Sequence, residues 1–253
     1  MQSIEDLVKK GDIINIVRIL CSTKNPKLQA ESAKSISILA KKGLVACEAI
    51  DKLNELLLRS DKNIKMQAAF AIGDMAESGA YKEESLKHLL YLSSEYDYEI
   101  RWSTTFALRT LVKCGVYDKN AISFFSEKLH DRSDKVTYNA AFAIGHLAEH
   151  GIVDKSTIPS LIALLTDKNA VCRKAAAFAL RNLAIKDVYD STSNSRELES
   201  LKEASKDSDK STRIYVSEAI DALIQRGVRD SKEKNEQTTN INITDSVVQR
   251  TNF

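Results

Sequence analysis

The sequence predicts an all-α protein, a solenoid of about six tandem two-helix repeats with a period of 36 residues. Two observations support this prediction. Apolar residues recur at fixed steps of 36 residues along much of the chain, and turn residues are scarce, with 8 glycines and 2 prolines among 253 residues. Scarce turn residues and abundant helix formers predict long helices that are joined by short connections.

The repeat becomes visible when the chain is counted in steps of 36 residues. One ladder consists of glycine and two others of large apolar residues: Gly43, Gly79, Gly115 and Gly151; Ile36, Ile72, Leu108, Ile144 and Leu180; Val17, Leu53, Leu89, Phe125 and Leu161. Chance does not maintain apolar ladders that span more than 140 residues. The chain is therefore interpreted as a tandem array of one structural unit.

Each repeat contains two helical patterns. The first, as in residues 49–58, carries apolar residues at the spacing of one helix face. The second, as in residues 63–79, is rich in alanine and ends at a glycine, where a left-handed C-cap turns the chain into the next repeat. Six of the eight glycines stand at this point of the pattern, namely Gly11, Gly43, Gly79, Gly115, Gly151 and Gly227. We therefore interpret these glycines as structural.

These patterns predict one solenoid over residues 1–230, followed by a C-terminal tail at residues 231–253. Residues 1–11 resemble the end of a second helix, and we expect them to form a half-repeat. The expected repeats are about 12–43, 44–79, 80–115, 116–151, 152–187 and 188–229, the last with about four extra residues after Asp187. The tail shows little apolar periodicity, so we expect it to be disordered.

Residues 158–184, with the sequence IPSLIALLTDKNAVCRKAAAFALRNLA, resemble an armadillo repeat. Three further stretches, DKNIKMQAAFAIGDMA, EIRWSTTFALRTLV and DKVTYNAAFAIGHLA, are similar to both armadillo and HEAT repeats. The resemblance extends over about residues 12–229. It implies the ARM-type fold of the armadillo/HEAT-repeat superfamily, a right-handed α-solenoid, and a protein-interaction module rather than an enzyme.

An aromatic ladder runs along the second helices at Phe70, Phe106, Phe142 and Phe178. Because each helical residue turns the chain by ~100°, Ile72 lies ~200° around the helix from Phe70. If Ile72 and its small neighbours face the core, Phe70 faces away from it. Packing of the rings between neighbouring repeats is the alternative interpretation, and the sequence leaves both open.

The positions four residues before and after each phenylalanine lie near the same face of the helix. They are Met66 and Asp74, Trp102 and Thr110, Tyr138 and His146, and Lys174 and Asn182. In the peptide-binding armadillo proteins that the chain resembles, this face lines a concave groove, where a tryptophan and an asparagine four residues apart hold an extended peptide. Phe178 and Asn182 match those two positions. The resemblance therefore implies a protein or peptide segment as the partner, bound along the concave face.

The motif around the ladder alternates between FAIG and FALR in successive repeats. This alternation suggests duplication of a pair of repeats, and it places Arg109 and Arg181 along the same rim. An arginine there can clamp acidic groups or backbone carbonyls of a partner. The alternative is an exposed, solvated side chain without a binding role.

The near balance of charge, with 37 Lys and Arg against 35 Asp and Glu, argues against a dedicated nucleic-acid binder, whose affinity depends on an excess of basic residues. A HEAT-like nucleic-acid-binding protein, of the DNA-glycosylase kind, nevertheless stays open as a rival, since Trp102 and Tyr138 would suit such a surface. A structural subunit within a larger assembly is the third alternative. The sequence does not predict the partner's identity or the oligomeric state.

We predict no catalytic residues, no metal site and no cofactor. The stretch 146–150, HLAEH, matches the HxxEH motif of inverted zinc peptidases, but it falls at the end of an ordinary repeat. The four cysteines form no CxxC pair, which predicts free thiols. The N-terminal stretch is too polar for a signal peptide and no apolar run is long enough to insert into a membrane, so we expect the cytoplasm, with the nucleus as the alternative.

Overall fold

The computed structural model describes residues 2–186 and 195–228, and within these ranges every regular element is helical. The predicted all-α fold is therefore confirmed. The predicted tail at residues 231–253 and the insertion after Asp187 lie outside the described residues. None of the helices in these ranges is long and apolar enough to span a bilayer. The chain divides into two compact units, residues 1–152 and residues 153–253.

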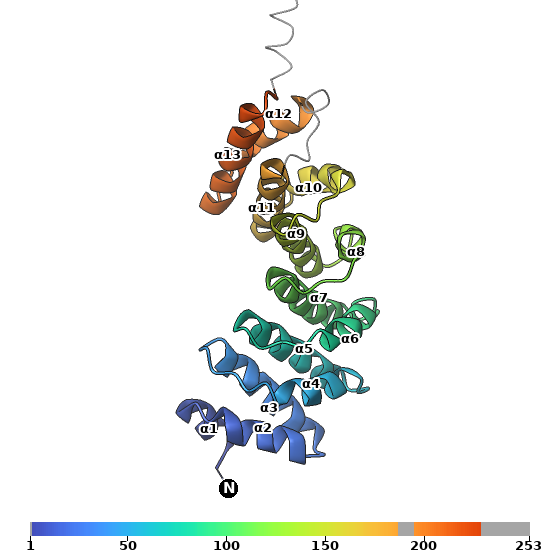
Figure 1. The fold of residues 1–253 in the computed structure, drawn as a ribbon, viewed down its shortest axis with the longest axis vertical. Helices are drawn as coiled ribbons and strands as arrows, with labels where there is room; N and C mark the ends of the chain where they lie inside the picture. Colours follow the sequence, from blue (N-terminus) through green and yellow to red (C-terminus); the bar gives the residue numbers. More distant parts are fainter. Residues whose placement is uncertain (1, 187–194, 229–253) are drawn as a thin grey trace, which may run out of the picture. The chain divides into compact units, whose positions relative to one another are not determined.

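The first unit contains nine of the described helices. They are α1 (Ile4–Lys10), α2 (Ile13–Ser22), α3 (Pro26–Ala40), α4 (Ala49–Leu57), α5 (Lys62–Glu77), α6 (Glu84–Leu92), α7 (Tyr98–Lys113), α8 (Ala121–Lys128) and α9 (Asp134–Glu149). After α1, the helices alternate between a short first helix and a long second helix (Figure 1). The short helix α1 packs against α2 and α3.

Two layers of helices make up the first unit. The second helices α3, α5, α7 and α9 lie side by side, and each packs extensively against the next (Figure 1). The first helices lie on the other side, each against the second helix of its own pair. Between the layers the apolar ladders close into a core, with the side chains of Leu53, Leu89, Ile36, Ile72, Leu108 and Ile144 at most 1% exposed.

The second unit continues the same alternation of short and long helices. It contains the 3₁₀ turn η1 (Lys155–Thr157) and the helices α10 (Ile158–Leu164), α11 (Ala170–Ile185), α12 (Ser195–Ala204) and α13 (Lys210–Gln225). The long helices α11 and α13 pack side by side, and α10 and α12 pack against them in turn. Leu161, Leu180, Leu201 and Leu223 form its buried core.

The ends of the second helices are determined by local hydrogen bonding. Their N-caps are Asn25, Asp61, Asp97, Ser133 and Asn169, each 36 residues after the last, and Asp209, 40 residues further on. All but Ser133 accept a hydrogen bond from a first-turn N–H, which satisfies a donor that the helix itself leaves unpaired. The six glycines predicted as C-terminal turns all have φ between 71° and 86°, so that prediction is confirmed.

Charged side chains join the loops of successive repeats. The Arg101 guanidinium donates from Nε and Nη2 to the two carboxylate oxygens of Asp131, at 2.7 and 3.0 Å, and from Nη1 to the carbonyl of Glu95 at 3.0 Å. The two side chains are only 14% and 8% exposed. One repeat earlier, Lys65 pairs with Glu95 at 3.0 Å. These pairs fix the loop of each repeat to the next, so register is set by polar as well as apolar contacts.

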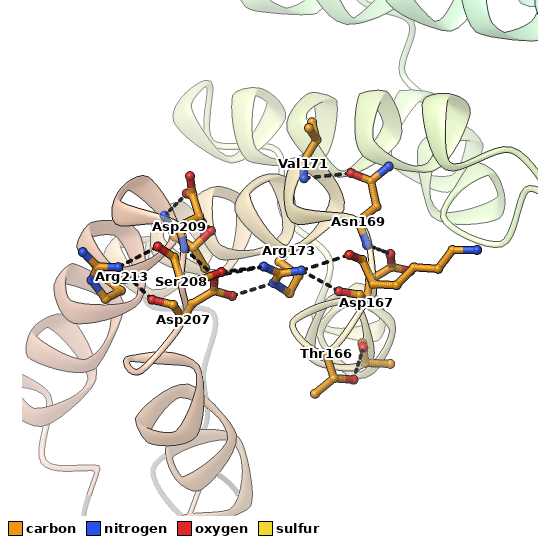
Figure 2. A network of polar contacts seen from close by, with 12 residues as sticks. Thr166, Asp167, Asn169, Val171, Arg173, Asp207, Ser208, Asp209 and Arg213 are labelled. Atoms are coloured by element: carbon orange, nitrogen blue, oxygen red, sulfur yellow. Dashed lines mark hydrogen bonds and ion pairs between the residues drawn. The ribbon is translucent and has the colours of Figure 1, made fainter.

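The second unit repeats this arrangement around Arg173 (Figure 2). Arg173 donates to both carboxylate oxygens of Asp207, at 2.6 and 3.1 Å, and to the carbonyl oxygens of Asp167 and Lys168 at 2.9 and 3.2 Å. The hydrogen bond from Arg173 holds the pKa of Asp207 below its ordinary value. Arg213 then donates to the carbonyl of Asp207 at 2.8 Å. The Arg173 guanidinium thus joins two loops, and Arg213 of α13 holds the second of them.

A single glycine allows α5 and α7 to approach closely. A Cβ at Gly73 would lie 2.8 Å from Cε1 of Phe106 and 3.0 Å from the backbone Cα of Ala107. Both distances are too short for a real methyl group, and the second contact is with backbone that cannot rotate away. The glycine of the FAIG motif is therefore required by the packing between repeats.

We expect Gly73→Ala to destabilise the protein by about 1–2 kcal/mol, because the strain of overpacking exceeds the gain in helix propensity. Urea unfolding followed by circular dichroism measures the change. In a Phe106→Leu background the cost should be smaller, because the nearest atom is removed. A Gly73→Ala variant at least as stable as the wild type would contradict the close approach.

Removing the carboxylate charge in Asp131→Asn should cost about 2–3 kcal/mol at neutral pH, since it leaves a largely buried guanidinium without its counter-charge. Burial alone would raise the pKa of Asp131, but the hydrogen bonds from Arg101 and the Ser133 amide outweigh it and the pKa is lowered. The stability from this carboxylate is therefore present above its ordinary pKa and is lost as the pH falls through the lower folded pKa.

The difference in unfolding free energy between wild type and Asp131→Asn should consequently shrink as the pH is lowered from about 5 to 3. The matched control is Asp51→Asn, which breaks the exposed pair with Lys82 and should change stability little. Equal effects of the two substitutions would contradict a structural role for the Arg101–Asp131 pair.

Candidate functional site

Five aromatic rings from three neighbouring second helices form a row on the first unit. They are Phe70 of α5, Trp102 and Phe106 of α7, and Tyr138 and Phe142 of α9, and all five are half-buried. The Phe70 ring meets Trp102 at 5.0 Å between centroids with the planes 74° apart, and it meets Phe106 at 5.5 Å. Edge-to-face contacts of this kind are the favoured geometry for aromatic pairs. We call these five residues the aromatic surface.

The position of the rings combines the two interpretations that the sequence left open. The rings lie where one second helix meets the next, so part of each ring packs between repeats. The remainder stays accessible to solvent, as does part of Met66 on the same face of α5. The aromatic surface is thus rigid, because packing holds the rings, and still has area with which a partner can make contact.

Four of the predicted site residues are buried, and the expectation that they face away from the core is wrong for them. Asp74, Thr110 and Asn182 are 2%, 1% and 4% exposed, and Phe178 is 8% exposed. The physical reason is that neighbouring second helices pack closely enough to cover these flanks. The angular position of a side chain around its own helix does not show how closely the next helix packs against it.

The buried polar groups at these positions have partners within the protein. Asp74 accepts a hydrogen bond from Ser37 of the preceding repeat and pairs with Lys41 at 3.3 Å. Burial raises the pKa of Asp74, although both contacts oppose the shift. The Thr110 hydroxyl donates to the carbonyl of Ala107 at 2.8 Å. These side chains stabilise the packing of the helices beneath the aromatic surface.

Arg109 of α7 is held by rings rather than by acceptors. Its guanidinium carbon lies 5.1 Å from the centroid of Phe106 and 5.7 Å from that of Phe142. Desolvation lowers the pKa of this half-buried side chain, yet within the described residues it makes no hydrogen bond and no ion pair. The interpretation of Arg109 as a freely solvated side chain is therefore wrong. Stacking orients the guanidinium and leaves its donors available.

Lys135, near the start of α9, is a second cation on the aromatic surface. Its ammonium nitrogen lies 3.8 Å from the Trp102 ring centroid, and the side chain is exposed. Within the described part of the chain it has no carboxylate partner. The sequence interpretation missed this residue because its counterparts in the sister repeats, Asn63, Glu99 and Val171, carry no cation. Its position seven residues before Phe142, on the same helix face, could have indicated it.

The carboxylates near the aromatic surface are paired, in contrast to these two cations. Glu77 pairs with Lys113 at 2.7 Å, and Glu149 with His146 at 2.8 Å. Glu99 pairs with Lys62. Burial lowers the pKa of His146, and the hydrogen bond with Glu149 acts against that shift. Arg109 and Lys135 therefore differ from these carboxylates in that neither has an ion-pair partner among the described residues, although Glu77 and Asp74 lie near enough to Arg109 to act on it electrostatically.

The HLAEH stretch serves the packing of the repeats. His146 faces Glu149, whereas His150 reaches back to α7, where its Nε2 lies 2.9 Å from the carbonyl oxygen of Val112. The His150 ring also contacts Tyr117 at 5.6 Å. Among the described residues, no group of three or more His, Cys, Asp or Glu is arranged to hold a metal ion.

The predicted residues of the second unit form a different arrangement. Arg181 pairs with Glu218 and also lies over the ring of Tyr215. The buried Phe178 ring meets Tyr215 at 5.5 Å, while Lys174 is half-buried. Tyr215 escaped the sequence interpretation because, after the 40-residue step to α13, it corresponds to Ala175 and not to a position of the aromatic ladder. Arg181 thus has the carboxylate partner that Arg109 lacks.

Comparisons with known proteins bear on the repeat type and the fold. Residues 122–224 match the family model of HEAT repeats. A designed armadillo repeat protein is similar in structure over 83% of this chain and 98% of its own, with 18% identity and a TM-score of 0.67. Another, solved in complex with the peptide (KR)4, matches over 83% of this chain and 98% of its own, with 19% identity and a TM-score of 0.62.

An engineered protein is similar over 85% of this chain and 97% of its own, with 20% identity and a TM-score of 0.64. No curated protein matches the sequence. At these identities the structural similarities concern the fold, and the HEAT-repeat match supplies the sequence relationship. Residues 122–224 thus match HEAT repeats in sequence, and the chain has the fold of the armadillo/HEAT-repeat solenoids.

Proposed function

We propose that the chain is a non-enzymatic interaction module, an adaptor that holds a protein or peptide segment of a partner along the aromatic surface. The observation that carries the proposal is the row of five partly accessible rings on three adjacent helices. Rings held in place by packing bury much area on binding at little cost in conformational entropy. Repeat-solenoid folds are typical of scaffolds, which supports the proposal.

The peptide complex of a designed armadillo repeat protein gives a precedent for an extended ligand, although its peptide (KR)4 is basic. The aromatic surface of this chain is suited to different chemistry, because the neighbouring carboxylates Glu77, Glu99 and Glu149 are already paired. In the second unit, Lys174 and Arg181 are the partly exposed members of the predicted set, and we propose them as a separate contact. We expect the module to act in the cytoplasm, with the nucleus as the alternative.

Nucleic acid is the second candidate ligand, and the cations stacked on rings favour it. Bases can stack on exposed rings while Lys and Arg contact phosphates. Against it stand a net charge of +2 and the small number of unpaired cations on this face. Such binding would weaken steeply with added salt, so a titration at two salt concentrations identifies it.

The double substitution Trp102→Ala and Tyr138→Ala should reduce recovery of partners in a crosslinking pull-down of the intact chain by at least about fivefold, since it removes two accessible rings. The matched control is Tyr91→Ala with Tyr96→Ala, which removes two rings that are 75% and 95% exposed on α6 and the loop after it. Unfolding midpoints measured alongside separate lost binding from lost folding. Unchanged recovery with the first pair would contradict the proposal.

Trp102 is the chain's one tryptophan, so its fluorescence reports directly on the aromatic surface. Lys135→Ala should shift the emission to longer wavelength, because removal of the side chain that covers the ring admits water. Lys119→Ala, an exposed lysine in a loop of the same unit, should leave the spectrum unchanged. An identical spectrum for Lys135→Ala would contradict the contact between Lys135 and Trp102.

A further inference from the structure

We infer that the segment bound at the aromatic surface is acidic, an extended peptide that presents both aspartate or glutamate and apolar side chains on the side that meets the surface. This inference rests on the proposed function, and it specifies the chemistry of the partner. Two features of the structure lead to it: the unpaired cations Arg109 and Lys135, and the pairing of the carboxylates around them.

Arg109 is a half-buried cation that has no hydrogen-bond acceptor among the described residues. A guanidinium that is partly withdrawn from water loses hydration, and an arrangement of this kind is costly unless an acceptor replaces the water. The described residues place two rings near its guanidinium carbon but no hydrogen-bond acceptor within bonding distance. A carboxylate is the group that fits the planar fork of N–H donors best, and it can accept two parallel hydrogen bonds. Arg109 is thus prepared for a carboxylate from outside the described structure.

Lys135 lies on α9, the second helix that follows α7. Its ammonium group rests on the Trp102 ring and stays exposed, so it can meet a second acidic side chain while the ring packs against an apolar one. In an extended segment, alternate side chains lie ~7 Å apart on the same side. Acidic side chains on that side can therefore meet the cations, while apolar side chains at other positions of the same side cover Phe70, Phe106 and Phe142.

A basic segment would fit this surface poorly. Glu77 and Glu99 are paired with lysines, Glu149 is hydrogen-bonded to His146, and Asp74 is buried. A single strand of nucleic acid would also be held less well, since its phosphates repeat at each nucleotide and two cations neutralise few of them. The charges of this surface therefore favour an acidic peptide over both.

The experiment is a selection of random 12-residue peptides displayed on phage against the intact, immobilised chain. We expect the enriched sequences to contain Asp and Glu in excess of the starting library, interspersed with apolar residues. One enriched acidic peptide, synthesised with a fluorescent label, then serves as the probe. Its affinity should fall at least about tenfold for Arg109→Met and about threefold for Lys135→Met, as expected when a charge-assisted contact is removed.

Two controls make the measurement specific. Arg59→Met removes the same kind of side chain from the exposed loop before α5, and the probe should bind this variant as it binds the wild type. Replacing the probe's Glu and Asp by Gln and Asn should weaken binding to the wild type but cause little further loss with Arg109→Met, as in a double-mutant cycle. Unfolding midpoints check each variant, and the exposed Lys135→Met provides the test if Arg109→Met does not fold.

Each contrary result has a distinct meaning. Enrichment of neutral or basic peptides, or a probe insensitive to both substitutions, would overturn the acidic inference and leave the interaction module standing. Failure to enrich any peptide would count against the proposed function and this inference together. Displacement of the probe by oligo(dT), with steep salt dependence, would assign the surface to nucleic acid instead.

Discussion

The close packing of each second helix against the next is the interaction on which the rest of this structure depends. A single helix pair cannot bury its apolar face, so the core exists only because neighbouring repeats cover one another. The small side chains of the second helices make that approach feasible. Ala68, Ala71, Ala107 and Ala143 are fully buried, and Gly73 admits the ring of Phe106 where even a methyl group would not fit.

The same packing creates the candidate site. In the first unit the large rings at the flank of the second helices are not covered completely by the next helix: Phe70 contacts Trp102 and Phe106, and all three rings stay partly accessible. Smaller polar residues one turn further on, such as Asp74 and Thr110, are covered. Size and position together therefore divide one helix flank into a contact surface and a buried polar layer.

The packing between repeats also explains the alternation of FAIG and FALR. At the glycine of α5, the next repeat's ring packs directly against the helix backbone. At the arginine of α7, a guanidinium occupies the corresponding place and stacks between Phe106 and Phe142. A pair of repeats thus provides one tight interface and one cation held by rings. The guanidinium gives the aromatic surface a positive charge that has no carboxylate partner. This charge determines which peptide segments the surface can attract.

Local patterns in the sequence determined the helical fold, the helix ends and the glycine turns. These features depend on hydrogen bonds and helix periodicity within about one repeat. Asp61 and Asp97 are residue types that favour an N-cap, and Gly79 is the residue type that favours a left-handed turn at a helix end. The aromatic ladder was also visible, because Phe70, Phe106 and Phe142 recur at a constant step.

Only the tertiary structure decided which of these positions are accessible and what each one contacts. The burial of Asp74, the stacking of Arg109 and the placement of Lys135 over Trp102 depend on how closely neighbouring helices pack. Helical periodicity gives the angle of a side chain about its own axis. It does not give the distance to the next helix, and that distance decides whether a side chain on the flank meets protein or partner.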